Sequence, residues 1–307
     1  MSWSPSDIPD QDGRVVVITG ANSGIGFEAA KVLSSRGAHV VMGCRSRDRA
    51  EAARVQVGGS AEVRELDLSD LSSVRAFAGS FDGSVDVLLN NAGIMAVPIA
   101  RTKDGFESQL GTNFLGHFAL TCLLLPRISD RVVTLSSMMH RAGRINLTDP
   151  NFERRRYNPW TAYGQSKLAD LMFAYELQRR LLLAGSAVRS LAAHPGYSST
   201  NLQSHLGPRW LHGAQDALAR VSPFVQSAEA GAAPALCAAT APDLPGGSYL
   251  GPSGLGEMTG PPQVVGSSRS SHDAATQRGL WELAERLTGV RVAISADAPT
   301  TRREPGS

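Results

Sequence analysis

The chain has 307 residues, of which 42% are hydrophobic and 19% are charged, and its formal net charge is +2. That composition is ordinary for a globular protein, and the length suits one large α/β domain better than two domains. The near-neutral charge argues against a nucleic-acid-binding protein, which would carry a basic stripe or a clustered basic face.

Residues 1–13 are expected to form a polar N-terminal tail. They lack the basic-then-apolar layout of a secretory signal peptide, and no apolar run approaches the ~20 residues that a membrane-spanning helix requires. The cysteines Cys44, Cys122 and Cys237 have neither the spacing of a disulfide framework nor that of a zinc site. We therefore expect a soluble, cytoplasmic protein with reduced thiols and no metal, in which the glycosylation sequon at Asn146 has no meaning.

From Arg14 onward, short β-branched runs alternate with stretches of helical pattern. Strands are predicted at Arg14–Thr19, Ala38–Gly43, Val63–Leu66, Val85–Leu89, Arg131–Leu135 and Val188–Ala193, and helices at Gly24–Ser35, Ser46–Val57, Ser72–Gly79, Phe106–Leu125 and Thr161–Ala184. This alternation predicts right-handed βαβ crossovers and a doubly wound parallel sheet. One α/β domain is expected over residues 14–290, followed by a C-terminal tail at 291–307.

The first predicted strand runs into a glycine-rich turn, residues 19–26 with the sequence TGANSGIG, and a helix follows at once. Glycines let the chain turn sharply and let a pyrophosphate approach the backbone, while the helix N-terminus offers unpaired N–H groups to that anion. The glycine spacing is not the Gly-x-Gly-x-x-Gly fingerprint. By itself the turn therefore leaves open both a nucleotide site and a simple glycine-rich connection.

Further motifs follow the later strands in order. The sequence NNAG at 90–93 follows the fourth strand, Ser136-Ser137 ends the fifth, YGQSK at 163–167 opens a long helix, and Pro195-Gly196 with Thr200 follows the sixth. With these motifs in register, the chain resembles the short-chain dehydrogenase/reductase (SDR) family from about Arg14 to Thr200. The resemblance implies a single Rossmann-like domain and an oxidoreductase that transfers a hydride between a nicotinamide cofactor and a carbonyl or alcohol.

The resemblance also implies which residues bind the cofactor. Gly20, Gly24 and Gly26 match the glycines under the pyrophosphate, with Asn22, Ser23 and Ile25 in the same turn. Asp67-Leu68 matches the pair that borders the adenine, and Asn91, with Ala92 and Gly93, matches the segment beside the cofactor. Pro195 and Gly196 precede Thr200, which matches the contact to the carboxamide.

The preferred nicotinamide cofactor depends on the end of the second strand. A carboxylate there, about 20 residues past the glycines, would hydrogen-bond the ribose 2′-OH of NAD. This chain has no such carboxylate, and Arg45 stands where a guanidinium can pair with a 2′-phosphate. A solvated arginine at a helix start is disfavoured by the helix dipole. The sequence therefore favours NADP(H) over NAD(H).

Tyr163 and Lys167 lie four residues apart, so both project from one face of the predicted helix. A free phenol, with a pKa of about 10, is a poor base at neutral pH, and a nearby lysine cation stabilises the phenolate. In the SDR family this pair transfers a proton to or from the substrate oxygen. Ser137 resembles the serine that hydrogen-bonds that oxygen, and Asn113 matches the asparagine of a water-mediated proton path to the lysine.

Between Ser137 and Tyr163 the chain is longer than in compact SDR members, and Arg141–Pro159 looks inserted. The inserted segment resembles the branch that holds retinol dehydrogenases and related lipophilic-carbonyl reductases, as do Cys44-Arg45 and residues 194–197. After Gly196 the sequence is irregular and apolar, which predicts a substrate lid at about 197–226. A lipophilic aldehyde, ketone or alcohol (retinal-like, steroid-like or fatty) is expected, with the inserted segment as the second wall.

The same resemblance suggests a homodimer or homotetramer that pairs through the helices from Phe106 and Thr161. His140 and His194 flank the predicted site, and packing or loop roles are expected for both because Tyr163 fills the acid/base role. Two other functions remain to be weighed. A catalytically idle nucleotide-binding sensor would be favoured by loss of Tyr163 or Lys167, and both are present. An extended-type sugar-nucleotide epimerase would carry a different glycine spacing and a larger C-terminal region.

Overall fold

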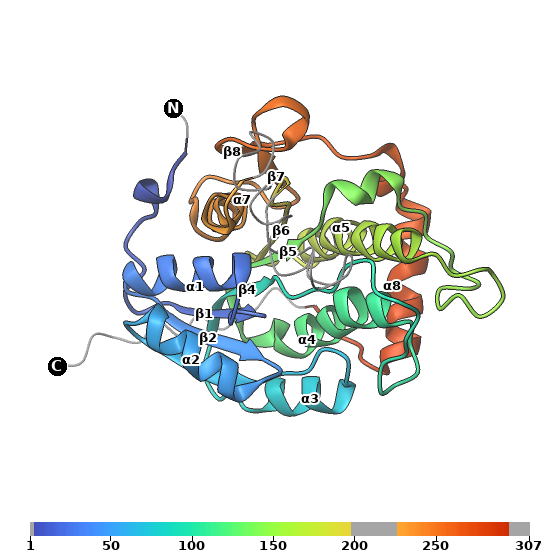
Figure 1. The fold of residues 1–307 in the computed structure, drawn as a ribbon, viewed down its shortest axis with the longest axis horizontal. Coiled ribbons are helices and arrows are strands. Elements are labelled where there is room, and N and C mark those ends of the chain that lie inside the picture. The colour runs from blue at the N-terminus through green and yellow to red at the C-terminus, as the bar shows by residue number, and fades with distance from the viewer. Residues whose placement is uncertain (1–2, 198–225, 295–307) are drawn as a thin grey trace, which may run out of the picture.

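The computed structural model describes residues 3–197 and 226–294 (Figure 1). Its strands are β1 (Val15–Thr19), β2 (His39–Cys44), β3 (Ala61–Glu65), β4 (Val85–Asn90), β5 (Ile128–Leu135), β6 (Arg189–Ala193), β7 (Tyr249–Pro252) and β8 (Pro262–Val264). Its α-helices are α1 (Gly24–Ser35), α2 (Arg47–Val57), α3 (Leu71–Gly79), α4 (Gly116–Leu124), α5 (Pro159–Leu183), α7 (Ala228–Thr240) and α8 (Ala274–Thr288). Within the described residues, no helix combines the length and the apolar character needed to cross a membrane.

The strands form one sheet in the order β3-β2-β1-β4-β5-β6-β7-β8. Every neighbouring pair is parallel except β7 and β8, which pair antiparallel at the edge. The chain order reverses between β1 and β4. In an open α/β sheet this reversal leaves a crevice at the carboxyl ends of the strands, where ligands bind.

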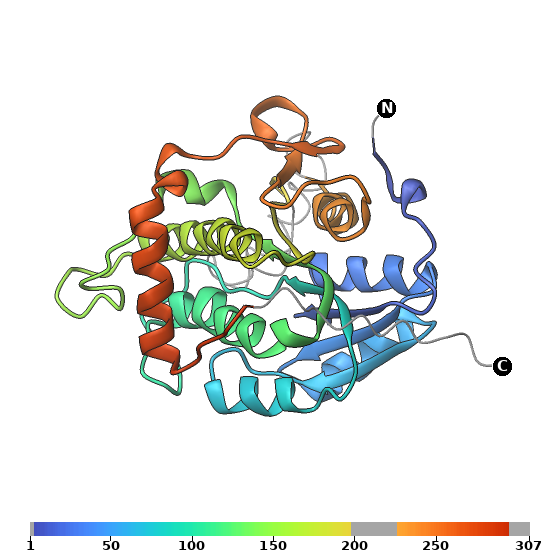
Figure 2. The same ribbon diagram turned by 180° about the vertical axis from the view of Figure 1, so that it is seen from behind.

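Helices cover both faces of the sheet, as the two opposite views show (Figures 1 and 2). On one face α1, α2 and α7 enclose a core with alternate residues of β1, β2 and β4, such as Val16, Ile18 and Leu89. On the other face α3, α4 and α5 enclose a second core with Val17 and Leu88. The strands are therefore apolar on both sides, which explains their nearly unbroken apolar sequences.

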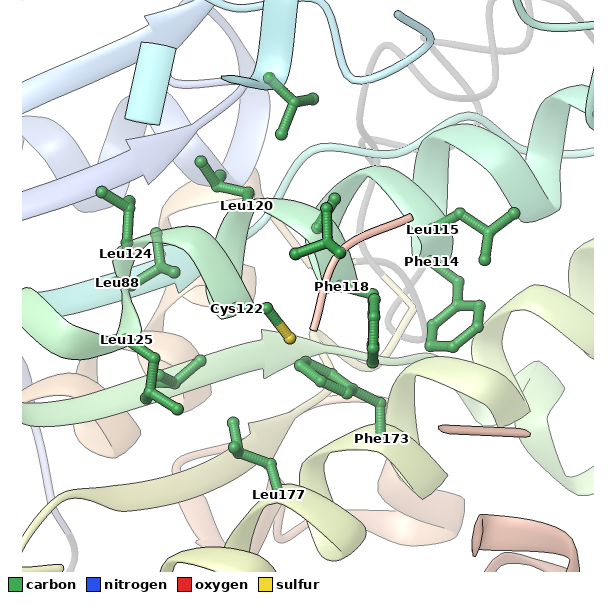
Figure 3. Close-up of a cluster of buried hydrophobic side chains, with 14 of the residues drawn as sticks. Leu88, Phe114, Leu115, Phe118, Leu120, Cys122, Leu124, Leu125, Phe173 and Leu177 are labelled. Atoms are coloured by element: carbon green, nitrogen blue, oxygen red, sulfur yellow. The ribbon is translucent and has the colours of Figure 1, made fainter. Parts of the chain in front are cut away.

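The helix α8 runs across α4 and α5 and adds a further layer there (Figure 1). Its Trp281 is 2% exposed and stacks on Phe173 of α5, with ring centroids 5.8 Å apart, and meets Phe118 of α4 edge-on at 5.0 Å. Figure 3 shows the rings of Phe118 and Phe173 lying together between the two helices. The α4 and α5 surface that the family resemblance offered for pairing is thus packed, at these residues, against the chain's own helix.

The predicted doubly wound α/β fold is confirmed, and the predicted strands and helices are all present with small shifts of their ends. The helix expected over Phe106–Leu125 is divided, because a π-helical turn at Leu110–Leu115 precedes α4. No helix or strand was predicted after β6, where the structure has α7, β7, β8 and α8. In the expected N-terminal tail, Ile8 is buried and packs in the first of the two cores.

Candidate active site

A cavity of about 330 Å³ opens at the carboxyl ends of β1, β2 and β4, at the reversal of strand order. Its walls contain most of the residues assigned to cofactor binding: Gly20, Asn22, Ser23, Gly24, Ile25, Arg45, Asp67, Leu68, Asn91, Ala92, Gly93, Tyr163, Lys167 and Pro195. Gly26, Asn113, Ser137 and Gly196 are near this lining in sequence but are not part of it. Thr200 and most of the expected lid lie outside the described residues.

The glycine-rich turn is shaped by steric demands that exclude side chains. Gly20 has a φ of +68° and Gly24 a φ of +57°, in the left-handed region that favours glycine. A Cβ on Gly26 would meet Asn91 Nδ2 at 2.3 Å and Gly20 O at 2.7 Å. The first turn of α1 carries no acidic residue, and the side chain of its N-cap Ser23 makes no capping bond. This arrangement leaves helix N–H groups free for an anion such as a pyrophosphate.

Thr19, at the end of β1, joins this turn to the segment after β4. Its Oγ1 accepts hydrogen bonds from the backbone N–H of Asn91 and of Ala92, both at 2.9 Å. Asn91 Nδ2 in turn donates to Thr19 O at 2.7 Å. The role assigned to Asn91 stays a prediction, but these contacts show that its side chain ties β4 to β1 at the cavity wall.

His117 continues this network to Asn113. Its Nδ1 lies 2.7 Å from Asn113 O and its Nε2 lies 2.8 Å from Thr19 Oγ1. Burial lowers the pKa of His117 to about 3, so the ring is neutral. Since Asn113 O can only accept, Nδ1 carries the proton, and Thr19 donates its own hydroxyl proton to Nε2. Sequence reasoning missed Thr19 and His117, although His117 stands one helical turn after Asn113.

Asn113 lies in the π-helical turn and is fully buried. Its Oδ1 accepts from Ile94 N at 2.8 Å, and its Nδ2 donates to Ile94 O and to Ser166 Oγ, both at 2.9 Å. Ser166 Oγ also donates to Tyr163 O. Asn113 therefore holds the segment after β4 against the start of α5. The π-helical turn is a local irregularity of the kind often found at functional sites.

Tyr163 and Lys167 lie on α5, which begins at Pro159 behind an Asn158 N-cap. Both residues are buried, at 6% and 5% exposure, and both line the cavity. Lys167 Nζ donates to Leu135 O at 2.9 Å and to Asp170 Oδ2 at 2.8 Å. Within the described residues, no hydrogen bond holds the hydroxyl of Tyr163, which leaves it available to a ligand.

The charge of Lys167 is set by competing effects. Burial acts to lower its pKa, but the Asp170 carboxylate and the Tyr163 phenol outweigh burial and raise it. Burial raises the pKa of Asp170 to about 6, against the attraction of Lys167. Both groups are charged at neutral pH and form a buried ion pair. Asp170 was not identified from the sequence, although its spacing of three residues from Lys167 is that of a helical ion pair.

The two serines after β5 have different surroundings. Ser136 Oγ donates to Lys167 O at 2.8 Å and so fixes α5 to the strand end. Ser137 Oγ accepts from Met139 N at 3.2 Å, and among residues 3–197 and 226–294 no acceptor takes its own proton. A hydroxyl that still has a donor to give suits contact with a substrate oxygen, which supports the second serine as the catalytic candidate.

Both ring nitrogens of His140 and of His194, the two histidines that flank the predicted site, make hydrogen bonds to neighbouring loops. His140 Nδ1 lies 2.7 Å from Ser137 O, and its Nε2 accepts from Ser268 N at 3.1 Å. His194 Nε2 lies 3.0 Å from Glu257 Oε2, and its Nδ1 accepts from Gly196 N at 3.2 Å. Burial lowers the pKa of His194 to about 3. These contacts agree with packing and loop roles.

Two arginines reach the cavity after β2. Arg45 and Arg49 both line it, and both are exposed; Arg45 is the residue that the sequence assigned to the 2′-phosphate. Arg47, between them, is not part of the lining. Sequence reasoning identified Arg45 but missed Arg49, which lies one helical turn further along α2.

The inserted segment Arg141–Pro159 is tied to the body of the domain. Arg155 stacks 3.7 Å from the ring centroid of Phe152 and donates to Gln165 Oε1 at 2.5 Å. Tyr157 donates to Val97 O at 2.9 Å. The arginine run at 154–156 is therefore partly engaged in protein contacts. The cavity described above includes none of this segment, and its role as a substrate wall stays a prediction.

In chemical terms, the site combines a cradle for a phosphate-bearing ligand with a proton donor. The glycine-rich turn, the N-terminus of α1 and the two arginines, all of which line the cavity, fit a dinucleotide. At the far end of the cavity, a phenol stands beside a buried ammonium. Among the described residues, no group of three or more histidine, cysteine or acidic side chains is arranged to hold a metal ion, and the three cysteines are free and buried.

The chain has many relatives of known name. A family model described as short chain dehydrogenase matches residues 14–209. Retinol dehydrogenase 13 of Homo sapiens is 38% identical over 95% of this chain and 88% of its own length. Retinol dehydrogenase 12 of Homo sapiens is 40% identical over 91% of this chain and 87% of its own length. Polyprenol dehydrogenase of Mus musculus is 40% identical over 94% of this chain and 87% of its own length.

Solved structures share the fold. An uncharacterised protein from Mycobacterium paratuberculosis is 53% identical, with a TM-score of 0.83 over 95% of this chain and 100% of its own. A protein from Beutenbergia cavernae, named as an NAD(P)-dependent gluconate 5-dehydrogenase and solved with bound NADP at low occupancy, is 27% identical. Its TM-score is 0.58, over 76% of this chain and 92% of its own.

Proposed function

The chain belongs to the short-chain dehydrogenase family, in its retinol dehydrogenase-like branch, and we propose that it is an NADP(H)-dependent enzyme acting on a lipophilic carbonyl or alcohol. Membership makes it an oxidoreductase that acts on CH–OH donors with a nicotinamide cofactor. The observation that carries the proposal is the pairing of Tyr163 and Lys167 on α5, both buried in the wall of the glycine-lined cavity.

The residues of the cavity fit the nicotinamide dinucleotide. Gly20, Gly24 and Gly26 would take its pyrophosphate at the N-terminus of α1, and Asp67 and Leu68 would border its adenine. The segment from Asn91 to Gly93 would lie beside it toward Lys167, since a Cβ on Gly93 would lie only 3.7 Å from Lys167 Nζ. When bound, the cofactor supplies or accepts the hydride.

The protein's own residues handle the proton. Tyr163 donates its phenolic proton to the substrate oxygen during reduction, or accepts the alcohol proton during oxidation. Ser137 donates a hydrogen bond to the same oxygen as negative charge develops on it. Lys167 keeps a positive charge beside the phenol, and Asn113 holds α5 and the segment after β4 in the register that this chemistry requires.

NADP(H) is the proposed cofactor because two guanidinium groups, Arg45 and Arg49, flank the end of β2 where a carboxylate would serve NAD. An arginine pairs with a phosphate through two parallel hydrogen bonds, which a 2′-hydroxyl cannot match. The second arginine adds to the preference inferred from the sequence.

The lipophilic substrate is proposed on two grounds. Relatives over nearly the whole chain bear the names of retinol and polyprenol dehydrogenases. The chain after Gly196 is also apolar, although residues 198–225 lie outside the described structure. The three buried free cysteines support a reducing compartment such as the cytoplasm. Neither the sensor nor the epimerase alternative is favoured by a contact in the described residues.

Replacing Tyr163 with Phe tests the proposal. Tyr163→Phe should leave NADPH binding nearly intact and lower turnover by a factor on the order of 10²–10⁴, as loss of a general acid/base does. Tyr175→Phe is the matched control. It removes a tyrosine hydroxyl from the same helix, and that hydroxyl contacts Ser267 Oγ outside the cavity. The assay follows NADPH absorbance with a panel of lipophilic aldehydes and ketones. Turnover of Tyr163→Phe within a few-fold of the control would refute the assignment.

A further inference from the structure

Both partners of the ion pair between Lys167 and Asp170 are buried. Lys167 is 5% exposed and Asp170 is 1% exposed, and both lie on the face of α5 that packs against the sheet. Lys167 Nζ gives one N–H to Leu135 O and a second to Asp170 Oδ2. An ammonium has three N–H groups, so one remains, and Lys167 lines the cavity together with Tyr163.

The charge balance of this group gives Asp170 a chemical consequence. With Lys167 protonated, Asp170 ionised and the phenol neutral, the three groups have no net charge. Loss of the phenolic proton leaves a net charge of −1 in a buried site, which burial and the Asp170 carboxylate both oppose. With a neutral side chain at position 170, the same loss takes the group from +1 to 0, which burial favours.

We propose that Asp170 is a positioning residue that holds the Lys167 ammonium in place and raises the pH at which the Tyr163–Lys167 pair releases its catalytic proton. The inference rests on the proposed function, because it assigns a control of that same proton. Tyr163 and Lys167 without the Asp170 carboxylate would release the proton at a lower pH. It predicts that the carboxylate moves the working range of alcohol oxidation toward alkaline pH.

The other titratable groups around this part of α5 do not supply an equivalent charge. The elements packed against it present His117 after the π-helical turn, His140 of the turn at Met138–Ala142, His194 after β6 and Tyr249 of β7. Burial lowers the pKa of all three imidazoles and raises the pKa of Tyr249, so all four are neutral near pH 7. The remaining ionisable groups make other contacts. They are Asp130 and Arg131 of β5, Arg189 of β6, His272 near Tyr175, and Arg180 and Glu285 around Trp281.

A second carboxylate on the same helix provides a matched control. Glu176 is fully buried and pairs with Arg179 at 2.6 Å and with Arg180 at 2.8 Å. It lies almost two turns beyond Asp170 and does not line the cavity. Asp170→Asn and Glu176→Gln each remove one buried negative charge from α5 and keep the side-chain shape. If the Lys167–Asp170 pair only stabilised the fold, Asp170→Asn and Glu176→Gln would have the same kind of effect on the titration.

The decisive measurement is a pH titration of tyrosinate absorbance in the cofactor-free protein. Each variant is titrated with Tyr163 and with Phe at that position, and the difference reports Tyr163 alone. The midpoint should fall in Asp170→Asn, because the variant removes the carboxylate that lies 2.8 Å from the Lys167 ammonium and opposes a second negative charge in this group. It should not move in Glu176→Gln. The rising limb of kcat/KM for alcohol oxidation should shift in the same direction.

An unchanged midpoint in Asp170→Asn overturns the proposal, as does an equal shift in Glu176→Gln. If Asp170→Asn does not fold, Asp170→Ser is read in the same way, and Asp170→Glu, which keeps the charge, must retain the wild-type midpoint. Failure of the proposed function would look different. In that case the wild type would oxidise no alcohol with NADP⁺, whereas the tyrosinate titration would still decide the role of Asp170.

Discussion

Thr19→Val tests whether the hydroxyl at the end of β1 organises the site. Valine keeps the shape of threonine but removes a hydroxyl that accepts two backbone N–H groups and donates to His117 Nε2. An unsatisfied buried group costs about 1–3 kcal/mol. His117 is fully buried and would bear that cost, whereas the N–H groups of Asn91 and Ala92 lie in partly exposed residues and would bear less. The expected loss of unfolding free energy is therefore about 2–4 kcal/mol.

The assay is urea denaturation, with the midpoint compared at an unchanged slope. Thr19→Ser is the matched control, because it keeps the hydroxyl and should lose much less stability. NADPH affinity, measured by fluorescence titration, should fall in Thr19→Val because the segment from Asn91 to Gly93 forms the cavity wall. Equal stability of Thr19→Val and wild type, or an equal loss in Thr19→Ser, would refute the hydrogen-bond reasoning.

Three further results are expected. NADPH should bind at least about tenfold more tightly than NADH, a difference of ~1.4 kcal/mol. Arg45→Ala should erase most of this preference, whereas Arg47→Ala should keep it. Equal effects of the two variants on the titrated affinities would contradict the assignment of Arg45. Trp281→Ala should lose about 3–5 kcal/mol of unfolding free energy in urea denaturation, because removal of the indole leaves a cavity beside Phe118 and Phe173; an unchanged midpoint would contradict this packing. Along a homologous aldehyde series, kcat/KM should climb by up to roughly fourfold per methylene, from ~0.8 kcal/mol of burial, and a flat series would rule out a lipophilic pocket.

Neither the role proposed for Asp170 nor the packing of Trp281 was identified from a motif. Asp170 is one of two acids in α5, and its spacing from Lys167 did not show that the ammonium is shared between its carboxylate and Leu135 O of β5. Trp281 lies in a segment to which the sequence analysis assigned no element. Its partners on α4 and α5 come more than a hundred residues earlier, a separation that local patterns do not reveal.

The sequence by itself determined the features that local chemistry encodes. Unbroken apolar runs identified the first six strands because both faces of the sheet are buried. The glycines at 20, 24 and 26 marked a turn in which, at Gly26, the Asn91 side chain leaves no room for a Cβ. Tertiary structure alone decided what depends on long-range contact. It placed β8 antiparallel at the sheet edge, where the free edge of β7 can pair with a strand of either direction. It packed α8 over α4 and α5, and it joined Thr19 to His117, 98 residues further along the chain, and through His117 to Asn113. Such contacts form only once the sheet has brought its strand ends together, so no local pattern specifies them.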